Sequence, residues 1–244
     1  MQTLFENRTY RSAISDDGLL RFSVSVKETN LFIRAPVKME REALDIVANA
    51  RFSIERYIAE RSEFATSLIP IDDDEFAPPI IREMMRDARI AGVGPMAGVA
   101  GAIAELVARR LREALQGGGD VIVENGGDIF LISTDERIVR LFVPGSDYRL
   151  GISIRDAKDG IGISSSSATI GYSLSLGRCD LATVIAKRGA LSDATATALG
   201  NSVLNKNEIG RALDDIVSLE GVLGGIVIAQ GVVGVKGDVR LISL

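Results

Sequence analysis

Early in the chain, apolar and polar residues alternate in a way that predicts paired strands. Residues Leu19–Val26 place apolar side chains at every second position, and Lys27–Asn30 separate them from a second apolar run, Leu31–Val37. A period of two is typical of a strand with one buried face, and the polar residues between the runs are typical of a turn. We therefore expect a β-hairpin.

After the hairpin, the spacing of apolar residues changes to that of a helix. Apolar side chains recur at three- and four-residue spacing over Met39–Ser62, which predicts a long amphipathic helix. Residues Asp72–Pro79 combine an acidic run with two prolines and predict an exposed loop, followed by a short helix over Ile80–Arg89. The glycine-rich segment Gly92–Gly101 leads into a further helix, Ala102–Leu115, which a run of glycines ends.

The second half of the chain contains mostly short apolar runs. We expect two strands flanking a glycine pair within residues 121–133, a polar loop over Ser164–Ser167, and helices over Ser192–Leu204 and Glu208–Leu219. The remaining strands are expected over Val139–Val143, Leu150–Ile154, Asp180–Ala186, Gly225–Ile228, Val232–Lys236 and Val239–Ser243.

The order of these elements predicts an α+β fold. Strands come in hairpins and helices come in pairs, so the sheet should be mainly antiparallel with helices packed on one face. Two strands, a set of helices and two more strands are followed by a similar set, although the two halves share no visible sequence similarity. We expect one domain over residues 1–244 with two structural half-repeats, because 244 residues fit around a single core.

Composition then narrows the classes of function. The 46% hydrophobic and 25% charged residues are typical of a globular protein, and the net charge of −5 comes without a basic stripe that would bind nucleic acid. The first residues show no signal sequence, which predicts a cytoplasmic protein, and the longest uncharged stretch, Gly221–Val235, is shorter than the roughly 20 residues that span a membrane. The chain has no histidine, so Ser-His and Cys-His pairs are excluded and no catalytic residue is assigned.

The first candidate site is formed by Asp193 and Thr197. Four residues separate them, so a helix would place both oxygens on one face near its N-terminus. A carboxylate and a hydroxyl suit a hard cation such as magnesium, which takes a few protein oxygens and completes its shell with water or phosphate. The alternative is structural: Ser192 would be the N-cap, Asp193 would complement the helix dipole, and Thr197 would be buried.

The second candidate is the segment Asn125-Gly126-Gly127-Asp128 between two apolar strands. Paired glycines allow a nucleotide or a ring to approach the backbone, and Asp128 can accept hydrogen bonds from such a ligand. Asn-Gly between strands is also the strongest short signal for a hairpin, so a purely structural turn explains the same residues.

The serine run Ser164–Ser167 is the third candidate. Hydroxyl and N–H groups in such a loop can bind a diphosphate, which makes Ser165, Ser166 and Ser167 candidate ligand contacts. A serine run is also common in a polar loop without a ligand. Cys179, the single cysteine, follows Arg178, which would favour a reactive thiolate, but a lone cysteine beside an apolar strand is more often an inert packed residue.

Four segments taken together resemble the ApbE family of magnesium-dependent flavin transferases. They are GAIAELVARRL at 101–111, ENGGDI at 124–129, SSSSATIG at 164–171 and LSDATATALGN at 191–201, and their order and spacing agree with the family over roughly residues 90–205. The resemblance implies a tunnelling-fold-like duplicated ββααββ unit. It also implies that magnesium and a flavin nucleotide, FAD or FMN, bind the chain.

The resemblance assigns roles residue by residue. Asp193 and Thr197 fall on the family's metal-binding side chains, and Ala102 falls where the family offers a backbone carbonyl to the metal. Gly126, Gly127 and Asp128 fall on the flavin-nucleotide turn.

The chain also departs from the family pattern. Glu105-Leu106 replaces the family's Lys-Gly, and the family's His-x-x-Asp-Pro-x-Thr-Gly segment has no counterpart. The chain looks more like the small cytoplasmic branch of the family that lacks the lipoprotein signal. Two functions follow as hypotheses: magnesium-dependent binding or transfer of a flavin nucleotide, or an accessory role in sulfur assimilation and homocysteine formation on the same fold. Homo-oligomer formation stays open.

Overall fold

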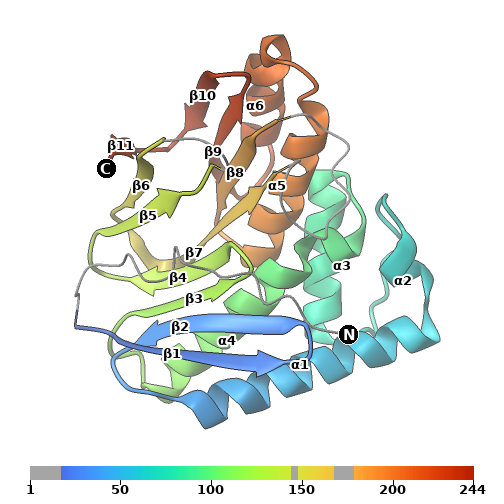
Figure 1. The fold of residues 1–244 in the computed structure, drawn as a ribbon. Coiled ribbons are helices and arrows are strands. Elements are labelled where there is room, and N and C mark those ends of the chain that lie inside the picture. Colours follow the sequence, from blue (N-terminus) through green and yellow to red (C-terminus); the bar gives the residue numbers. More distant parts are fainter. Residues whose placement is uncertain (1–17, 144–147, 168–178) are drawn as a thin grey trace, which may run out of the picture.

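The computed structural model describes residues 18–143, 148–167 and 179–244, and its centre is an eight-stranded sheet (Figure 1). The strand order is β1-β2-β3-β4-β7-β8-β9-β10, and every neighbouring pair is antiparallel. The strands are β1 Leu20–Val26, β2 Thr29–Ala35, β3 Val121–Asn125, β4 Asp128–Ser133, β7 Ala157–Ser166, β8 Leu181–Ala186, β9 Val222–Ala229 and β10 Val232–Gly237.

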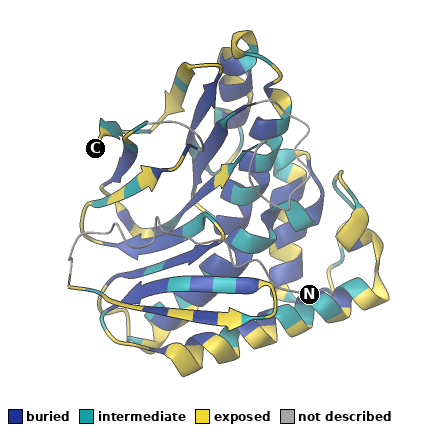
Figure 2. Ribbon diagram, in the orientation of Figure 1, coloured by how far each residue is buried: buried dark blue, intermediate teal, exposed yellow. Residues whose placement is uncertain are grey.

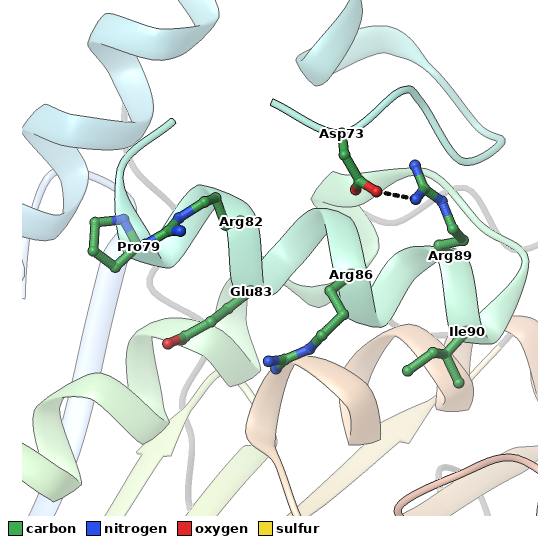
Figure 3. Close-up of a pocket in the computed structure, with 7 residues that line it drawn as sticks. All are labelled: Asp73, Pro79, Arg82, Glu83, Arg86, Arg89 and Ile90. Atoms are coloured by element: carbon green, nitrogen blue, oxygen red, sulfur yellow. Dashed lines mark hydrogen bonds and ion pairs between the residues drawn. The ribbon is translucent and has the colours of Figure 1, made fainter. Parts of the chain in front are cut away.

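Helices cover one face of this sheet. Helices α1 and α4 lie over β1–β4, α5 lies over β7 and β8, and α6 lies over β9 and β10 (Figure 1). Helix α3 packs outside α5 and turns an arginine-bearing side outward (Figure 3). The helices are α1 Glu40–Glu60, α2 Glu63–Thr66, α3 Pro79–Ala91, α4 Val99–Ala114, α5 Gly189–Ser202 and α6 Ile209–Val217, with 3-10 turns η2 Pro95–Gly98 and η3 Lys206–Glu208.

A three-stranded sheet covers the opposite face. It contains β5 Arg137–Leu141, β6 Leu150–Ile154 and β11 Leu241–Ser243, in the order β11-β6-β5. Because successive strand residues point to opposite faces, Phe130 and Ile132 pack towards the helices while Leu131 packs towards the small sheet. Both faces of the large sheet are therefore buried over its central strands, while the edge strands β1 and β10 are largely exposed (Figure 2). The expected α+β class, with a mainly antiparallel sheet and helices on one face, is confirmed.

Two differences from the predicted elements bear on the candidate site. Residues Ser164–Ser166 belong to strand β7 and not to a loop, because alternate hydroxyls find partners on the two sides of the sheet. Helix α5 begins at Gly189, three residues before Ser192, so Ser192 is a fully buried residue inside the helix and is no N-cap. Part of the segment SSSSATIG, residues 168–171, lies outside the described residues.

Within the described parts of the chain, no single helix has the length and apolar content to cross a bilayer. Only the bent pair Pro79–Ala91 and Pro95–Ala114, which meets at 104°, satisfies that length and composition test jointly.

Candidate functional site

Helices α4 and α5 cross at two glycines whose backbones are in direct contact. A Cβ atom at Gly101 would lie 2.1 Å from the carbonyl oxygen of Gly189, and a Cβ at Gly189 would lie 2.3 Å from the carbonyl oxygen of Gly101. Real Cβ atoms are never that close to an oxygen, so only glycine fits at either position. The crossing brings the first turns of both helices together.

Asp193 lies at this crossing and is one of the residues that the sequence singled out. Its Oδ2 accepts the backbone N–H of Gly101 at 3.0 Å. Loss of solvation raises the pKa of Asp193 to about 7, and hydrogen bonds from the backbone of Gly101 and Ala100 oppose that rise. The Asp193 side chain therefore binds the start of α4 and is partly protonated near neutral pH.

Asp128 is the second carboxylate of the site. It begins β4, directly after the turn of Gly126 and Gly127, whose φ angles are +69° and +111°. Loss of solvation raises the pKa of Asp128 well above its ordinary value, repulsion from Asp193 raises it further, and a hydrogen bond with Ser164 opposes the rise. The fold thus brings together two acids that lie far apart in the sequence.

The glycine turn is a two-residue hairpin, with Asn125 paired to Asp128 across it. The positive φ angles explain both glycines without a ligand, as the hairpin interpretation expected. A Cβ atom at Gly126 or Gly127 would meet no atom within 4 Å, so no close contact requires glycine at either position.

Two more predicted metal residues flank the acid pair. Thr197 follows Asp193 by one turn of α5 and is half-buried on the same helix face. Ala102 is buried next to Gly101 in α4. Among the described residues, no group of three or more His, Cys, Asp or Glu side chains is placed to hold a metal. Two carboxylates with a hydroxyl are nevertheless a donor set that magnesium uses when phosphates and water complete its shell.

The serine run divides between the two faces of β7. Ser164 Oγ lies 2.8 Å from the Oγ of Ser192 and also bonds to Asp128, so it links the acid pair to α5. Ser166 faces the same helix beside Gly200, while Ser165 Oγ lies 2.9 Å from Thr183 Oγ1. Ser165 is thus paired with the adjacent strand, and Ser166 lies against α5.

The last serine of the run has a partner too. Ser167 donates to the carbonyl of Asp180 at 2.9 Å. The serine that touches the candidate site is therefore Ser164, which the prediction of ligand contacts left out.

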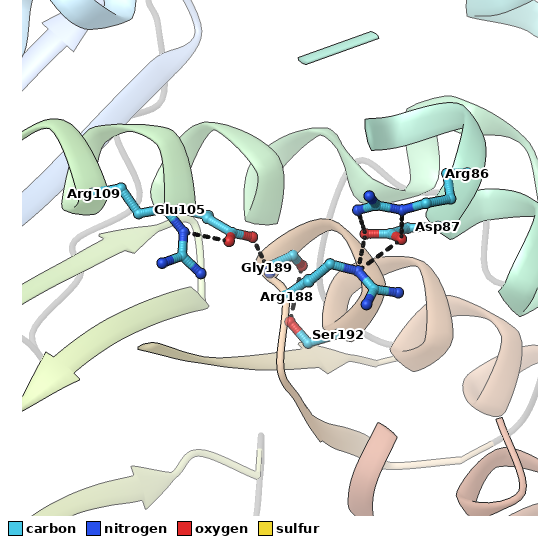
Figure 4. Close-up of polar contacts among 7 residues, drawn as sticks. All are labelled: Arg86, Asp87, Glu105, Arg109, Arg188, Gly189 and Ser192. Atoms are coloured by element: carbon cyan, nitrogen blue, oxygen red, sulfur yellow. Dashed lines mark hydrogen bonds and ion pairs between the residues drawn. The ribbon is translucent and has the colours of Figure 1, made fainter. Parts of the chain in front are cut away.

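Sequence reasoning gave Glu105 no function of its own, although it noted that this residue replaces a family lysine. Glu105 Oε2 accepts the N–H of Gly189, the first residue of α5, at 2.6 Å, and its Oε1 accepts from Arg109 Nε at 2.7 Å (Figure 4). Arg109 in turn lies over the Phe130 ring at 5.0 Å and donates to the carbonyl of Asp159 at 3.2 Å. A glutamate here caps α5, which a lysine would not do.

A second polar group anchors the other side of α5. Arg188 Nε donates to both oxygens of Asp87 on α3, at 3.0 and 3.1 Å, and Arg86 Nε donates to the same carboxylate at 2.9 Å (Figure 4). Asp87 is only 1% exposed. The N-terminus of α5 is therefore held from α4 and from α3.

A cavity of about 350 Å³ opens between α1, the start of α4 and the end of β3. Its polar end contains Arg51, which donates to Thr29 Oγ1 at 2.7 Å and to Glu55 Oε1 at 2.9 Å, and whose buried Nε has no partner among the described residues. At the other end, Asn125 Nδ2 donates to the carbonyl of Ala100 at 3.1 Å. The apolar walls are formed by Ile54, Ile58, Met96, Val99 and Ile103.

Cys179 is packed rather than reactive in its setting. It is 1% exposed, and its Sγ lies 3.7 Å from the carbonyl oxygen of Gly200. Burial raises the pKa of the Cys179 thiol, which keeps it protonated. Arg178, the residue suggested to activate it, lies outside the described residues.

The sequence of this chain is similar to those of known proteins. Residues 11–238 match the family model described as AbpE bacteria. The chain is 37% identical over 224 residues to the UPF0280 protein of Methanocaldococcus jannaschii, covering 88% of this chain and 90% of that protein. It is 33% identical over 228 residues to the UPF0280 protein of Methanococcus aeolicus, covering 91% of each.

Solved structures share the fold at much lower identity. The ApbE protein of Thermotoga maritima aligns with a TM-score of 0.58 at 10% identity, covering 90% of this chain and 96% of that one. The flavinyl transferase ApbE of Pseudomonas stutzeri aligns with a TM-score of 0.58 at 13% identity, covering 92% and 94%. Because the family model spans most of the chain and the UPF0280 proteins are similar over most of their length, the chain belongs to the ApbE-like family.

Proposed function

We propose that this protein binds a flavin nucleotide, FAD or FMN, together with a magnesium ion held by Asp128, Asp193 and Thr197. The observation that carries the proposal is the pair of acids at the α4–α5 crossing, whose pKa values are both raised, that of Asp193 to about 7. Two carboxylates that repel each other in a poorly solvated place are stabilised by a cation between them.

The donor set fits magnesium better than a softer metal. All three side chains offer oxygen, and magnesium is usually bound by one or two carboxylates while substrate phosphates and water fill the other positions. A bound cation would neutralise diphosphate charge and polarise the phosphoryl group. The carbonyl of Ala102 remains a candidate fourth donor by resemblance to the family.

The cavity of about 350 Å³ beside α1 supports the flavin part of the proposal. Its size lies in the range of small-molecule sites, and its apolar walls with a few polar groups at the ends suit a flat heterocycle with a hydrogen-bonding edge. The buried Nε of Arg51 offers a donor that such an edge would satisfy. Ala100 links the cavity to the acid pair, since the next residue, Gly101, binds Asp193.

We also propose that the chain is a single domain with two tunnelling-fold-like half-repeats. In support, β1, β2, the first helices, β3 and β4 form one ββααββ order, and β7, β8, α5, α6, β9 and β10 form another. The two sets lie side by side in one continuous sheet.

The accessory role in sulfur assimilation has no specific observation in its favour. The buried, protonated Cys179 is a poor sulfur carrier. Flavin binding is therefore the function that the site supports best.

The test is a titration of the purified chain with FAD at fixed magnesium, followed by flavin fluorescence or calorimetry. We expect saturable binding that is lost when magnesium is chelated and is weakened at least tenfold by Asp193→Asn or Asp128→Asn, since each removes one charge from the cation site. Asp156→Asn, an exposed acid outside the site, is the matched control and should bind FAD as the original chain does. A flat titration of the folded protein would refute the proposal.

Transfer is tested separately, by release of AMP when FAD, magnesium and a candidate acceptor are incubated with the chain. Moving FMN from FAD to an acceptor hydroxyl breaks the diphosphate bond, so one AMP leaves for each flavin transferred. AMP release that depends on Asp193 would support a transferase, and binding without AMP would support a non-catalytic flavin-binding protein.

A further inference from the structure

A second cavity, of about 570 Å³, lies on the outward side of α3 (Figure 3). It shares no lining residue with the acid pair or with the cavity beside α1. Its walls are formed by Asp73, Pro79, Arg82, Glu83, Arg86, Arg89 and Ile90. We propose that this cavity binds a small phosphate monoester, with the phosphate on the arginines of α3.

The three arginines share one side of α3 by their spacing. Arg82, Arg86 and Arg89 lie four and three residues apart, which places neighbours on one helix face. Figure 3 shows them along the side of the helix that lines the cavity. A guanidinium presents paired N–H groups that match phosphate oxygens, so a row of them suits this anion.

Two of these guanidinium groups are already held in place. Arg89 forms an ion pair with Asp73 and donates to the carbonyl of Ile71 at 2.8 Å. Arg86 shares the carboxylate of Asp87 with Arg188, so two positive groups bind one negative group. Asp87 therefore orients Arg86 beside the cavity, and Glu83 and Glu105 are further acids close to this arginine.

Arg82 is the arginine of the lining that has no ion pair or hydrogen bond among the described residues, and its side chain is exposed. Glu83, next to Arg82 on the same helix, is an acid of the lining. Loss of solvation and the neighbouring Glu105 raise the pKa of Glu83, and Arg86 opposes the rise. The lining contains three arginines and two acids, Asp73 and Glu83, so a small anion complements the cavity.

The volume of the cavity limits the size of the ligand that it can bind. Its volume is within the range of small-molecule sites and exceeds what inorganic phosphate alone would fill. Pro79 and Ile90 give it apolar surface beside the arginines. A phosphate carrying a short organic group therefore fits better than a free phosphate ion.

The experiment is a titration of the full chain with glycerol 3-phosphate, followed by amide NMR shifts of α3 at ionic strength held constant with chloride. A parallel titration uses inorganic phosphate. We expect saturable shifts with both, with tighter binding of glycerol 3-phosphate. Arg82→Gln should weaken binding about fivefold, as for loss of one exposed charged contact, and Glu83→Gln should strengthen it about twofold to fivefold.

Opposite effects of neighbouring substitutions separate ligand binding from a loss of folding, because damage to α3 would weaken binding in both variants. Arg41→Gln, an exposed arginine on α1, is the charge-matched control and should leave the affinity unchanged. The proposal is overturned if shifts do not saturate, if Arg82→Gln binds like the original chain, or if Arg41→Gln weakens binding as much as Arg82→Gln. Binding of inorganic phosphate with no binding of glycerol 3-phosphate would overturn the assignment to a monoester.

Discussion

Glu105 on α4 and Asp193 on α5 each accept a backbone N–H from the helix that carries the other. Glu105 binds Gly189 at 2.6 Å, and Asp193 binds Gly101 at 3.0 Å. Both N–H groups lie in a first helical turn, where no intrahelical partner exists and the helix dipole favours negative charge. These two hydrogen bonds join α4 to α5 at their crossing. They therefore also hold in position the carboxylate of Asp193, a candidate metal ligand.

Replacement of Gly101 or Gly189 by alanine should destabilise the fold. The added methyl group would lie within 2.1 or 2.3 Å of a backbone oxygen, so the helices must separate. We expect the free energy of unfolding, measured by urea denaturation, to fall by about 2 kcal/mol or more. Gly210→Ala is the control, because its Cβ would meet no atom within 4 Å, and it should gain up to about 1 kcal/mol. Equal effects at all three positions would contradict the close crossing.

The α5 cap predicts a graded effect at Glu105. Glu105→Ala removes both the acceptor for Gly189 and the partner of Arg109, so the free energy of unfolding should fall by about 1–2 kcal/mol. Glu105→Gln keeps a hydrogen-bond acceptor of the same shape and should lose about half as much. Denaturation curves of the two variants compare them directly, and a Gln variant as unstable as the Ala variant would speak against capping.

The raised pKa of Asp193 predicts that stability falls as pH rises. Its value is raised from 3.8 to about 7, so between these pH values the folded chain keeps a proton that the unfolded chain has lost. The stability that this proton gives is complete below about pH 4 and is lost as pH rises through about 7.

Asp193→Asn should remove this dependence. In metal-free buffer near pH 8, we expect the variant to have a higher melting temperature and a free energy of unfolding about 1–2 kcal/mol larger than the original chain. Both differences should vanish near pH 4. Thermal melts over that range measure it, with Asp156→Asn as the exposed control. A constant difference at every pH would mean that Asp193 titrates normally.

Magnesium affinity should rise with pH through about 7. A cation at the acid pair must displace the proton that Asp193 holds, so binding is weaker where the carboxyl is protonated. Calorimetry in two buffers of different ionisation enthalpy should detect proton release on magnesium binding near pH 6.5, roughly half to one proton, and little near pH 9. Asp128, whose pKa is also raised, can release a proton too, so release that persists in both Asp193→Asn and Asp128→Asn would assign the titration to a group outside the pair.

The thiol of Cys179 should be protected in the folded chain. It is 1% exposed with a raised pKa, so a disulfide reagent should react at least a hundredfold more slowly with the native protein than with the denatured protein, on the order expected for a buried thiol. Absorbance of the released thiolate measures both rates. Rapid labelling of the native protein would reopen the sulfur-carrier hypothesis.

Local signals in the sequence were sufficient where a structure depends on neighbouring residues. The hairpin at Gly126–Gly127 is an example, because the turn requires two positive φ angles that glycine adopts freely. The helical period of α1 is another, since it predicted the helix and the buried Val47 and Ile54, although Leu44 and Phe52 of the same apolar run are exposed.

Local sequence signals gave wrong predictions where a residue's hydrogen-bond partner is distant in the sequence. A run of serines looks like a loop, yet Ser164 bonds to Ser192 on α5 and Ser165 to Thr183 on the adjacent strand, 28 and 18 residues away. Glu105 carried no local sign of capping a helix that begins 84 residues later.

The sequence by itself determined most of the helices and strands, though not β7, together with the α+β class and Asp193 and Thr197 as an oxygen pair on one helix. Periodicity and spacing act within a few residues of the chain. Only the tertiary structure decided that Asp128 lies beside Asp193, that two glycines bring their helices into contact and that the serines face opposite ways. Those features depend on which helices and strands pack against each other in the folded chain. No single segment of the sequence determines that packing.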